Sequence, residues 1–110
     1  MKKLTKSFLT LMLGVCCSNV YAGTGWGKVT RIQPVLADTV IFTVENHVTM
    51  PSCSNQGLDW ALSLTTNTGR AQYSLLLAAA AQKKSVSITG FHDCRAWGDR
   101  EAPYFIIMDY

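Results

Sequence analysis

The sequence lacks the motifs of nucleotide, phosphate and acyl-transfer chemistry. It contains no Gly-x-Ser-x-Gly turn, no glycine-rich phosphate-binding loop and no pair of carboxylates at a spacing typical of acid–base catalysis. It also lacks internal repeats, low-complexity tracts and linkers. These absences predict one small domain that is not an enzyme and that uses no cofactor.

The N-terminal apolar run is too short to cross a bilayer, which needs about 20 residues. It extends from Phe8 to Cys17, and Val20-Tyr21-Ala22 follows with small residues at the −3 and −1 positions of a signal peptidase site. Three lysines precede the run: Lys2, Lys3 and Lys6. We therefore predict a secretory signal peptide over 1–22, a mature domain over 23–110, and a periplasmic or secreted location.

Two other interpretations of the N-terminus remain open. A membrane anchor is disfavoured by the length of the apolar run. A lipoprotein site at Leu13-Gly14-Val15-Cys16 is disfavoured because Val15 is bulky where a small residue is needed.

The mature domain has little charge and no excess of either sign. The whole chain carries 10 Lys+Arg and 7 Asp+Glu. Three lysines leave with the signal peptide, so the formal charge of the remainder is zero. Nucleic-acid binding, which needs clustered basic residues, is not expected.

The mature domain keeps only two of the four cysteines, Cys53 and Cys94. In an exported domain, two cysteines most simply form one disulfide. Closing the loop 53–94 would stabilise the domain by about 4 kcal/mol in the loop-entropy estimate. Two free buried thiols are the alternative. Neither cysteine has another at metal-ligand spacing, so no metal site is predicted.

Alternating apolar residues predict five strands, and one segment without glycine, proline or β-branched residues predicts a helix. Asn67 or Thr68 is expected to cap the start of this helix. The predicted elements, in chain order, are strands over Lys28–Val35, Val40–Glu45 and Leu58–Thr65, a helix over Arg70–Lys84, and strands over Ser85–Phe91 and Pro103–Met108.

This order fits a mostly β domain, a small five-stranded OB-fold-like barrel with its helix between the third and fourth strands. Trp60 alternates with Leu62 and Leu64, which places it in the core. The predicted helix is apolar on all sides. It either covers the barrel mouth alone or contacts a neighbouring subunit as well, and we favour the second interpretation. The expected interface residues are Tyr73, Leu76, Leu77 and Ala80.

Several stretches carry a resemblance to a known family. They are Gly27-Lys28-Val29-Thr30-Arg31-Ile32, Trp60-Ala61-Leu62, Gly69-Arg70 with Tyr73-Ser74-Leu75-Leu76-Leu77-Ala78-Ala79-Ala80, and Lys84-Ser85-Val86-Ser87-Ile88-Thr89-Gly90 followed by a cysteine. In this pattern the mature chain resembles the binding (B) subunits of bacterial pentameric toxins, in particular the subtilase-cytotoxin branch. The resemblance implies an OB-fold, a ring of five subunits with helices around the pore, glycan binding, and an enzymatic A subunit as partner.

One departure concerns the sugar site. Subtilase-type B subunits have a sugar-contacting serine just before the glycine of the first strand, and this sequence has Trp26 there. The resemblance therefore transfers no sugar-contacting residue. The residues themselves offer two candidate pairs, Trp97 with Arg95 and Trp26 with Lys28, because an aromatic platform with a charged rim suits a sugar ring. The alternative for the loop around Trp97 is a solvated surface with local ion pairs.

The densest polar cluster is His92-Asp93-Cys94. A Cys–His nucleophile pair or a metal site there would need a free thiolate, which a disulfide removes. A site shared between His47 and His92 would depend on the fold.

The leading hypothesis is thus an exported glycan-binding protein that forms a ring. The alternative is a monomeric periplasmic OB-fold domain with a protein-binding or inhibitory role and no toxin partner.

Overall fold

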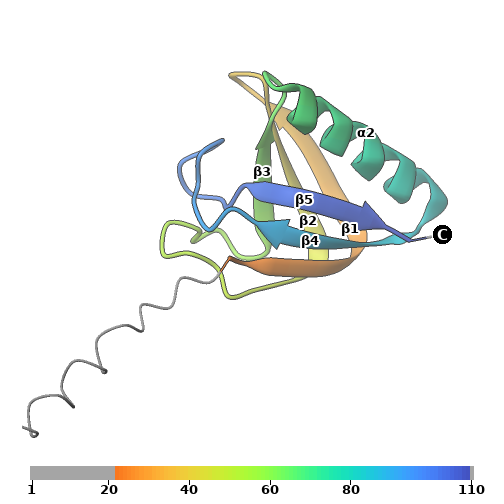
Figure 1. Ribbon diagram of the computed structural model, residues 1–110, viewed down its shortest axis with the longest axis horizontal. Coiled ribbons are helices and arrows are strands. Elements are labelled where there is room, and N and C mark those ends of the chain that lie inside the picture. Colours follow the sequence, from red (N-terminus) through yellow and green to blue (C-terminus); the bar gives the residue numbers. More distant parts are fainter. Residues whose placement is uncertain (1–21, 110) are drawn as a thin grey trace, which may run out of the picture.

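The computed structural model describes residues 22–109, which form one five-stranded antiparallel sheet and one helix (Figure 1). The elements are β1 (Thr24–Val35), β2 (Thr39–Val48), β3 (Asp59–Ser63), α2 (Asn67–Gln82), β4 (Ser85–Gly90) and β5 (Pro103–Met108). The predicted order of three strands, a helix and two strands is confirmed. The predicted signal peptide lies outside the described residues, except for Ala22. Over the described part of the chain, no helix combines the length and apolar character needed to cross a membrane.

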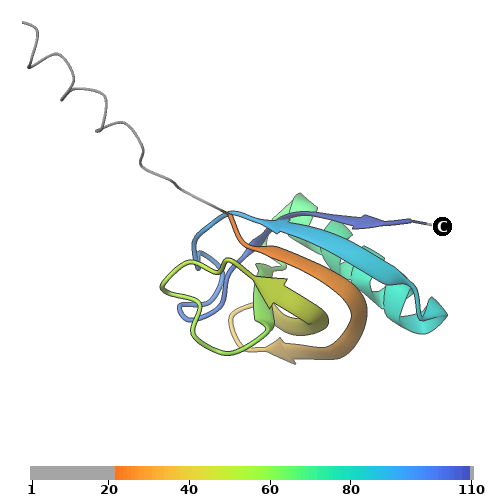
Figure 2. The same ribbon diagram turned by 90° about the horizontal axis from the view of Figure 1, so that it is seen from below.

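The strands lie in the order β3-β2-β1-β4-β5, so β3 and β5 form the two edges of the sheet. The sheet is strongly curved, and β1 bends most visibly (Figure 2). This curvature brings the two edges together at one point, where Trp60 and Glu101 form an isolated parallel bridge. The amide of Ala61 donates to the Glu101 carbonyl at 3.0 Å. No continuous ladder closes the sheet over residues 22–109, so the structure supports the mostly β class and leaves the predicted closed barrel unconfirmed.

Strand β1 begins four residues earlier than the predicted start at Lys28. Its early part contains Gly25 and Gly27, which have low strand propensity. A side chain at Gly25 would lie 2.9 Å from the indole of Trp60, so only glycine allows β1 to pass so close to the core. The register between β1 and β2 shifts between Trp26 and Val29, and Gly27 has a φ of 115° there.

Helix α2 starts slightly before its predicted position. Thr66 caps it, because its hydroxyl accepts the Gly69 amide at 2.9 Å, so the expected caps Asn67 and Thr68 are wrong. The helix ends at Gln82, and Lys83 terminates it in the left-handed conformation, with a φ of 56°.

One stripe of α2 is buried against the sheet, namely Gly69, Gln72, Leu76 and Ala79. These residues follow the three- and four-residue spacing of a single helix face. The prediction that Trp60 lies in the core is confirmed, because it is fully buried. The remaining core side chains come from three strands, β2, β3 and β4, and the helix: Val40, Phe42, Val44, Leu62, Leu76, Ala79, Val86 and Ile88.

The predicted disulfide between Cys53 and Cys94 is confirmed, so the alternative of two free thiols is wrong. It joins the loop after β2 to the loop between β4 and β5, two segments separated by 41 residues. These loops therefore lie together at one end of the sheet.

Candidate functional site

A groove of about 490 Å³ runs between the start of α2 and the segment that connects β4 to β5. Its walls are mostly apolar with a few hydroxyl and charged groups, which is typical of small-ligand sites. The lining residues are Leu62, Ser63, Thr65, Thr66, Thr68, Gly69, Gln72, Phe91, Arg95, Ala96, Ala102, Pro103 and Tyr104.

Two aromatic rings form the apolar wall of this groove. Phe91 and Tyr104 meet edge to face with their centroids 5.0 Å apart. Both side chains are exposed, and Tyr104 retains 55% of its accessible surface. Gln72 holds the adjacent backbone, because its side-chain amide donates to the carbonyl of Tyr104 at 3.2 Å. The rings are therefore a fixed surface on which the flat face of a ligand can rest.

Arg95 lies across the same wall. Its guanidinium carbon is 3.6 Å from the centroid of Phe91, a cation–π contact. Asp93 orients it through hydrogen bonds of 2.9 Å from Nε and 2.8 Å from an Nη nitrogen. The hydrogen bond from Arg95 lowers the pKa of Asp93 below its ordinary value, and the carboxylate raises the pKa of Arg95. The guanidinium thus stays charged and fixed at neutral pH.

The opposite wall is the N-terminal turn of α2. The partial positive charge of a helix N-terminus favours anions nearby. Thr68 and Gly69 line the groove from this turn, and Ser63 and Thr65 add hydroxyl groups. The groove therefore combines an aromatic surface, one oriented cation and several hydroxyl groups.

Of the four predicted ligand-binding residues, Arg95 lines this groove and the other three do not. Trp97 lies on the same loop and bridges to Arg100. Trp26 and Lys28 project from β1, where Trp26 pairs with Asn46 and Ser87 on the neighbouring strands. The two predicted aromatic–cation pairs therefore do not form one site.

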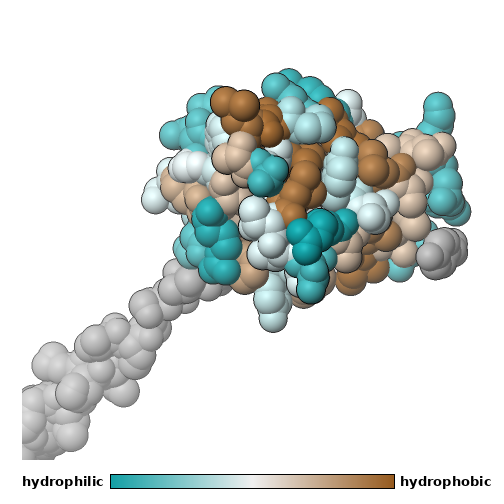
Figure 3. Space-filling model, turned by 90° about the horizontal axis from the view of Figure 1, so that it is seen from above, coloured by the Kyte–Doolittle hydropathy of each residue, from teal (hydrophilic) through white to brown (hydrophobic). Residues whose placement is uncertain are grey.

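The four predicted interface residues differ in how much of each side chain is exposed. Leu76 is fully buried in the core of its own chain, which leaves no surface for a neighbouring subunit and corrects its predicted role. Leu77 retains 45% of its surface, and Tyr73 and Ala80 are half-buried. In the view onto the α2 side of the molecule, apolar and polar side chains alternate (Figure 3).

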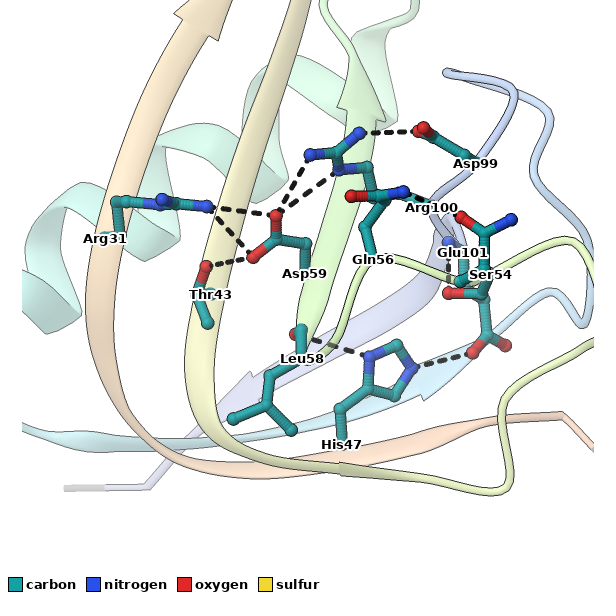
Figure 4. Close-up of polar contacts among 11 residues, drawn as sticks. Arg31, Thr43, His47, Ser54, Gln56, Leu58, Asp59, Asp99, Arg100 and Glu101 are labelled. Carbon is teal, nitrogen blue, oxygen red and sulfur yellow. Dashed lines mark hydrogen bonds and ion pairs between the residues drawn. The ribbon is translucent and has the colours of Figure 1, made fainter.

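A buried polar cluster lies at the end of the sheet that carries the disulfide. Glu101 and His47 are fully buried at their side chains, and His47 Nε2 lies 2.9 Å from a Glu101 carboxylate oxygen (Figure 4). The other imidazole nitrogen, Nδ1, faces the carbonyl of Leu58 at 3.3 Å. The imidazole also stacks on Trp60, with the ring centroids 3.8 Å apart.

A second polar cluster surrounds Asp59 (Figure 4). Its carboxylate accepts hydrogen bonds from Arg31 at 3.0 Å, from Arg100 at 3.2 Å and from the hydroxyl of Thr43 at 2.7 Å. Arg100 also pairs with Asp99 at 2.6 Å. This network joins β1, β2 and β3 to the loop that precedes β5.

Neither cluster has the geometry of a nucleophile pair. Cys94 is oxidised in the disulfide, so the Cys–His nucleophile considered at His92 has no thiolate. His47 is buried against Glu101, so it has no access to a substrate in solution. Over residues 22–109, no group of three His, Cys, Asp or Glu side chains could hold a metal ion.

Sequence reasoning missed both the aromatic wall and the buried carboxylate. The alternation in Ser85–Phe91 predicts that Phe91 ends a strand, and Glu101 follows Asp99 and Arg100 in a run of mixed charge near Trp97. Adjacent charges of both signs around Glu101 are typical of a surface, so nothing in that local pattern indicates burial. Comparison with protein-family models, curated proteins and solved structures finds no match to this chain.

We predict that Glu101→Ala strongly destabilises the protein. The substitution leaves His47 Nε2 and the amides of Gly23 and His92 without their acceptor in a buried site. Removing one member of a buried pair costs about 3–5 kcal/mol. Chemical denaturation would measure this loss. Glu45→Ala is the matched control, because Glu45 is exposed and its loss should cost less than about 1 kcal/mol. Equal effects at the two positions would contradict the role given to Glu101.

Proposed function

We propose that the mature chain is an exported binding protein that holds a glycan in the groove between α2 and the β4–β5 connection. The observation that carries this proposal is the arrangement of Phe91, Tyr104 and Arg95 on one wall. The apolar face of a sugar ring packs on exposed aromatic rings, while hydroxyl groups and an oriented cation bind its polar edge.

The charges of the groove favour an acidic sugar over a neutral one. Arg95 and the N-terminal turn of α2 lie on opposite walls, and both attract a carboxylate. Asp93 neutralises part of the Arg95 charge. Its carboxylate accepts hydrogen bonds from only two of the three guanidinium nitrogens, Nε and one Nη. The second Nη nitrogen of Arg95 is left for a ligand.

The fold supports this proposal at a coarser level. Five antiparallel strands with one helix between the third and fourth is the order of an OB-fold, and the edges β3 and β5 approach each other at Trp60 and Glu101. We therefore include an OB-like barrel, and the resemblance to toxin B subunits, in the proposal. An enzymatic A subunit is the partner that this resemblance implies.

We further propose that copies of the chain associate in a ring. The edge strand β5 carries three exposed apolar side chains, Tyr104, Phe105 and Ile107. An exposed apolar edge is normally covered, since it can pair with another strand. Leu77 adds an exposed apolar side chain on α2. A monomeric domain with a protein ligand is the competing function, and it would cover the same edge with a different partner.

We predict that Arg95→Ala weakens binding to acidic glycans by about tenfold or more, because a hydrogen bond to a charged group contributes about 1.5–3 kcal/mol. A glycan array followed by titration calorimetry on the strongest ligand would measure the change. Arg70→Ala is the matched control. Arg70 is an arginine in the first turn of α2, close to the groove, but it does not line the groove. If the native protein bound neither acidic nor neutral glycans on the array, that result would contradict the proposed function.

Native mass spectrometry of the mature protein tests the ring. We expect a closed oligomer of five copies, and we expect Ile107→Lys to shift the population to the monomer by placing a charge on the exposed β5 edge. Lys28→Ala, on a different strand, should leave the oligomer intact. A strict monomer at micromolar concentration would contradict the ring and favour the monomeric alternative.

A further inference from the structure

The backbone nitrogen of Gly23 contacts the buried polar cluster of Glu101 and His47. It donates to Glu101 Oε2 at 2.8 Å, in a buried contact between residues 78 positions apart. The carbonyl of Gly23 accepts the Gly90 amide at 2.9 Å, and the next residue, Thr24, pairs with Thr89 on β4. The hydrogen bonds of the sheet therefore fix the position of this nitrogen.

The structure leaves no space for a side chain at position 23. A Cβ atom there would lie within 1.9 Å of a Glu101 carboxylate oxygen, and a Cβ atom at Gly90 would lie within 2.0 Å of the other. Glu101 is fully buried. The carboxylate is therefore enclosed between two glycines, and the backbone nitrogen of Gly23 approaches it directly.

The carboxylate of Glu101 has few partners that can carry positive charge. Over residues 22–109 its only ion-pair contact is with His47, at 2.9 Å. Its other donors are two backbone amides, from Gly23 and His92. A buried carboxylate that is paired only in part is costly, so a full positive charge at this point would stabilise the fold.

We propose that removal of the signal peptide after Ala22 supplies this charge, as the α-ammonium group of Gly23. This inference rests on the exported state in the proposed function. A signal peptidase hydrolyses the Ala22–Gly23 bond with one water molecule. The oxygen of the water joins the Ala22 carbonyl carbon to give a carboxylate, and the Gly23 nitrogen becomes an amine that takes up a proton.

The product is an ion pair that the unprocessed chain lacks. Before cleavage the Gly23 nitrogen is an amide with one neutral N–H group. After cleavage the same nitrogen, held in place by Gly90 and Thr24, is a cation against Glu101. Charge-assisted hydrogen bonds are roughly twice as strong as neutral ones. Processing thus fixes the start of β1 to the loop that precedes β5.

The test compares two exported proteins. The first is the native full chain, and the second has one alanine inserted after Ala22. Cleavage after Ala22 keeps Val20 at the −3 position, whereas cleavage one residue later would place bulky Tyr21 there. The second product therefore begins with alanine and keeps Gly23 as an amide. Intact mass establishes both N-termini.

Labelling of the α-amine with an acylating reagent near neutral pH gives the main readout, measured on the N-terminal proteolytic peptide. We expect the native product to react at least about tenfold more slowly than the alanine-extended one, since its amine is buried and paired, and its folding equilibrium constant to be about tenfold larger. Glu101→Gln keeps the shape and most hydrogen bonds without the charge. This substitution should abolish the stability difference and speed the labelling of the native N-terminus.

Three outcomes would overturn the inference. Equal labelling rates with a native product that begins at Gly23 would show that its amine is free, while leaving export intact. A stability difference that persists in Glu101→Gln would assign the effect to something other than the ion pair. A native product that keeps its leader, or is cleaved elsewhere, would overturn both the ion pair and the proposed export, and the mass alone distinguishes this case.

Discussion

The hydrogen bonds around Glu101 are the constraint on which the rest of the structure depends. The strand order leaves the sheet open, and over residues 22–109 its two edges are bridged only between Trp60 and Glu101. The carboxylate then joins the start of β1, the end of β4 and the imidazole of His47. The nearby disulfide joins the loop after β2 covalently to the loop between β4 and β5. One buried side chain thus connects segments that are far apart in the sequence.

This cluster also positions the groove. Glu101 holds the amide of His92, and Phe91 immediately before it donates its amide to the carbonyl of Ala102. These hydrogen bonds fix the backbone next to the two aromatic residues of the groove wall, Phe91 and Tyr104. The loop that carries Arg95 is further restrained by Cys94. In the proposed function the buried end of the sheet supports the binding surface without contacting the ligand.

The order of the strands and the helix could be predicted because each element has a clear local pattern of residue types. Val40, Phe42 and Val44 alternate along β2, and the alanine-rich segment has no residue that disfavours a helix. Two cysteines in a domain expected to be exported also predicted their disulfide. Glu101 was not predictable in this way, because its burial depends on contacts with Gly23, His47 and Gly90, which are distant in sequence. The start of β1 is not predictable for the same reason, since Gly25 is required by the distant Trp60, and Gly27 lies against Glu45 with a positive φ.

The central claim is that Glu101 joins the two edges of the sheet into one cooperative unit. Native-state hydrogen exchange tests it most directly at two amides, Ala61, which donates to the Glu101 carbonyl, and His92, which donates to its carboxylate. We predict that both exchange only through global unfolding, with the same free energy as the core amides of β2. Exchange of these two amides through a local opening several kcal/mol below that value, while β2 stays protected, would contradict the account.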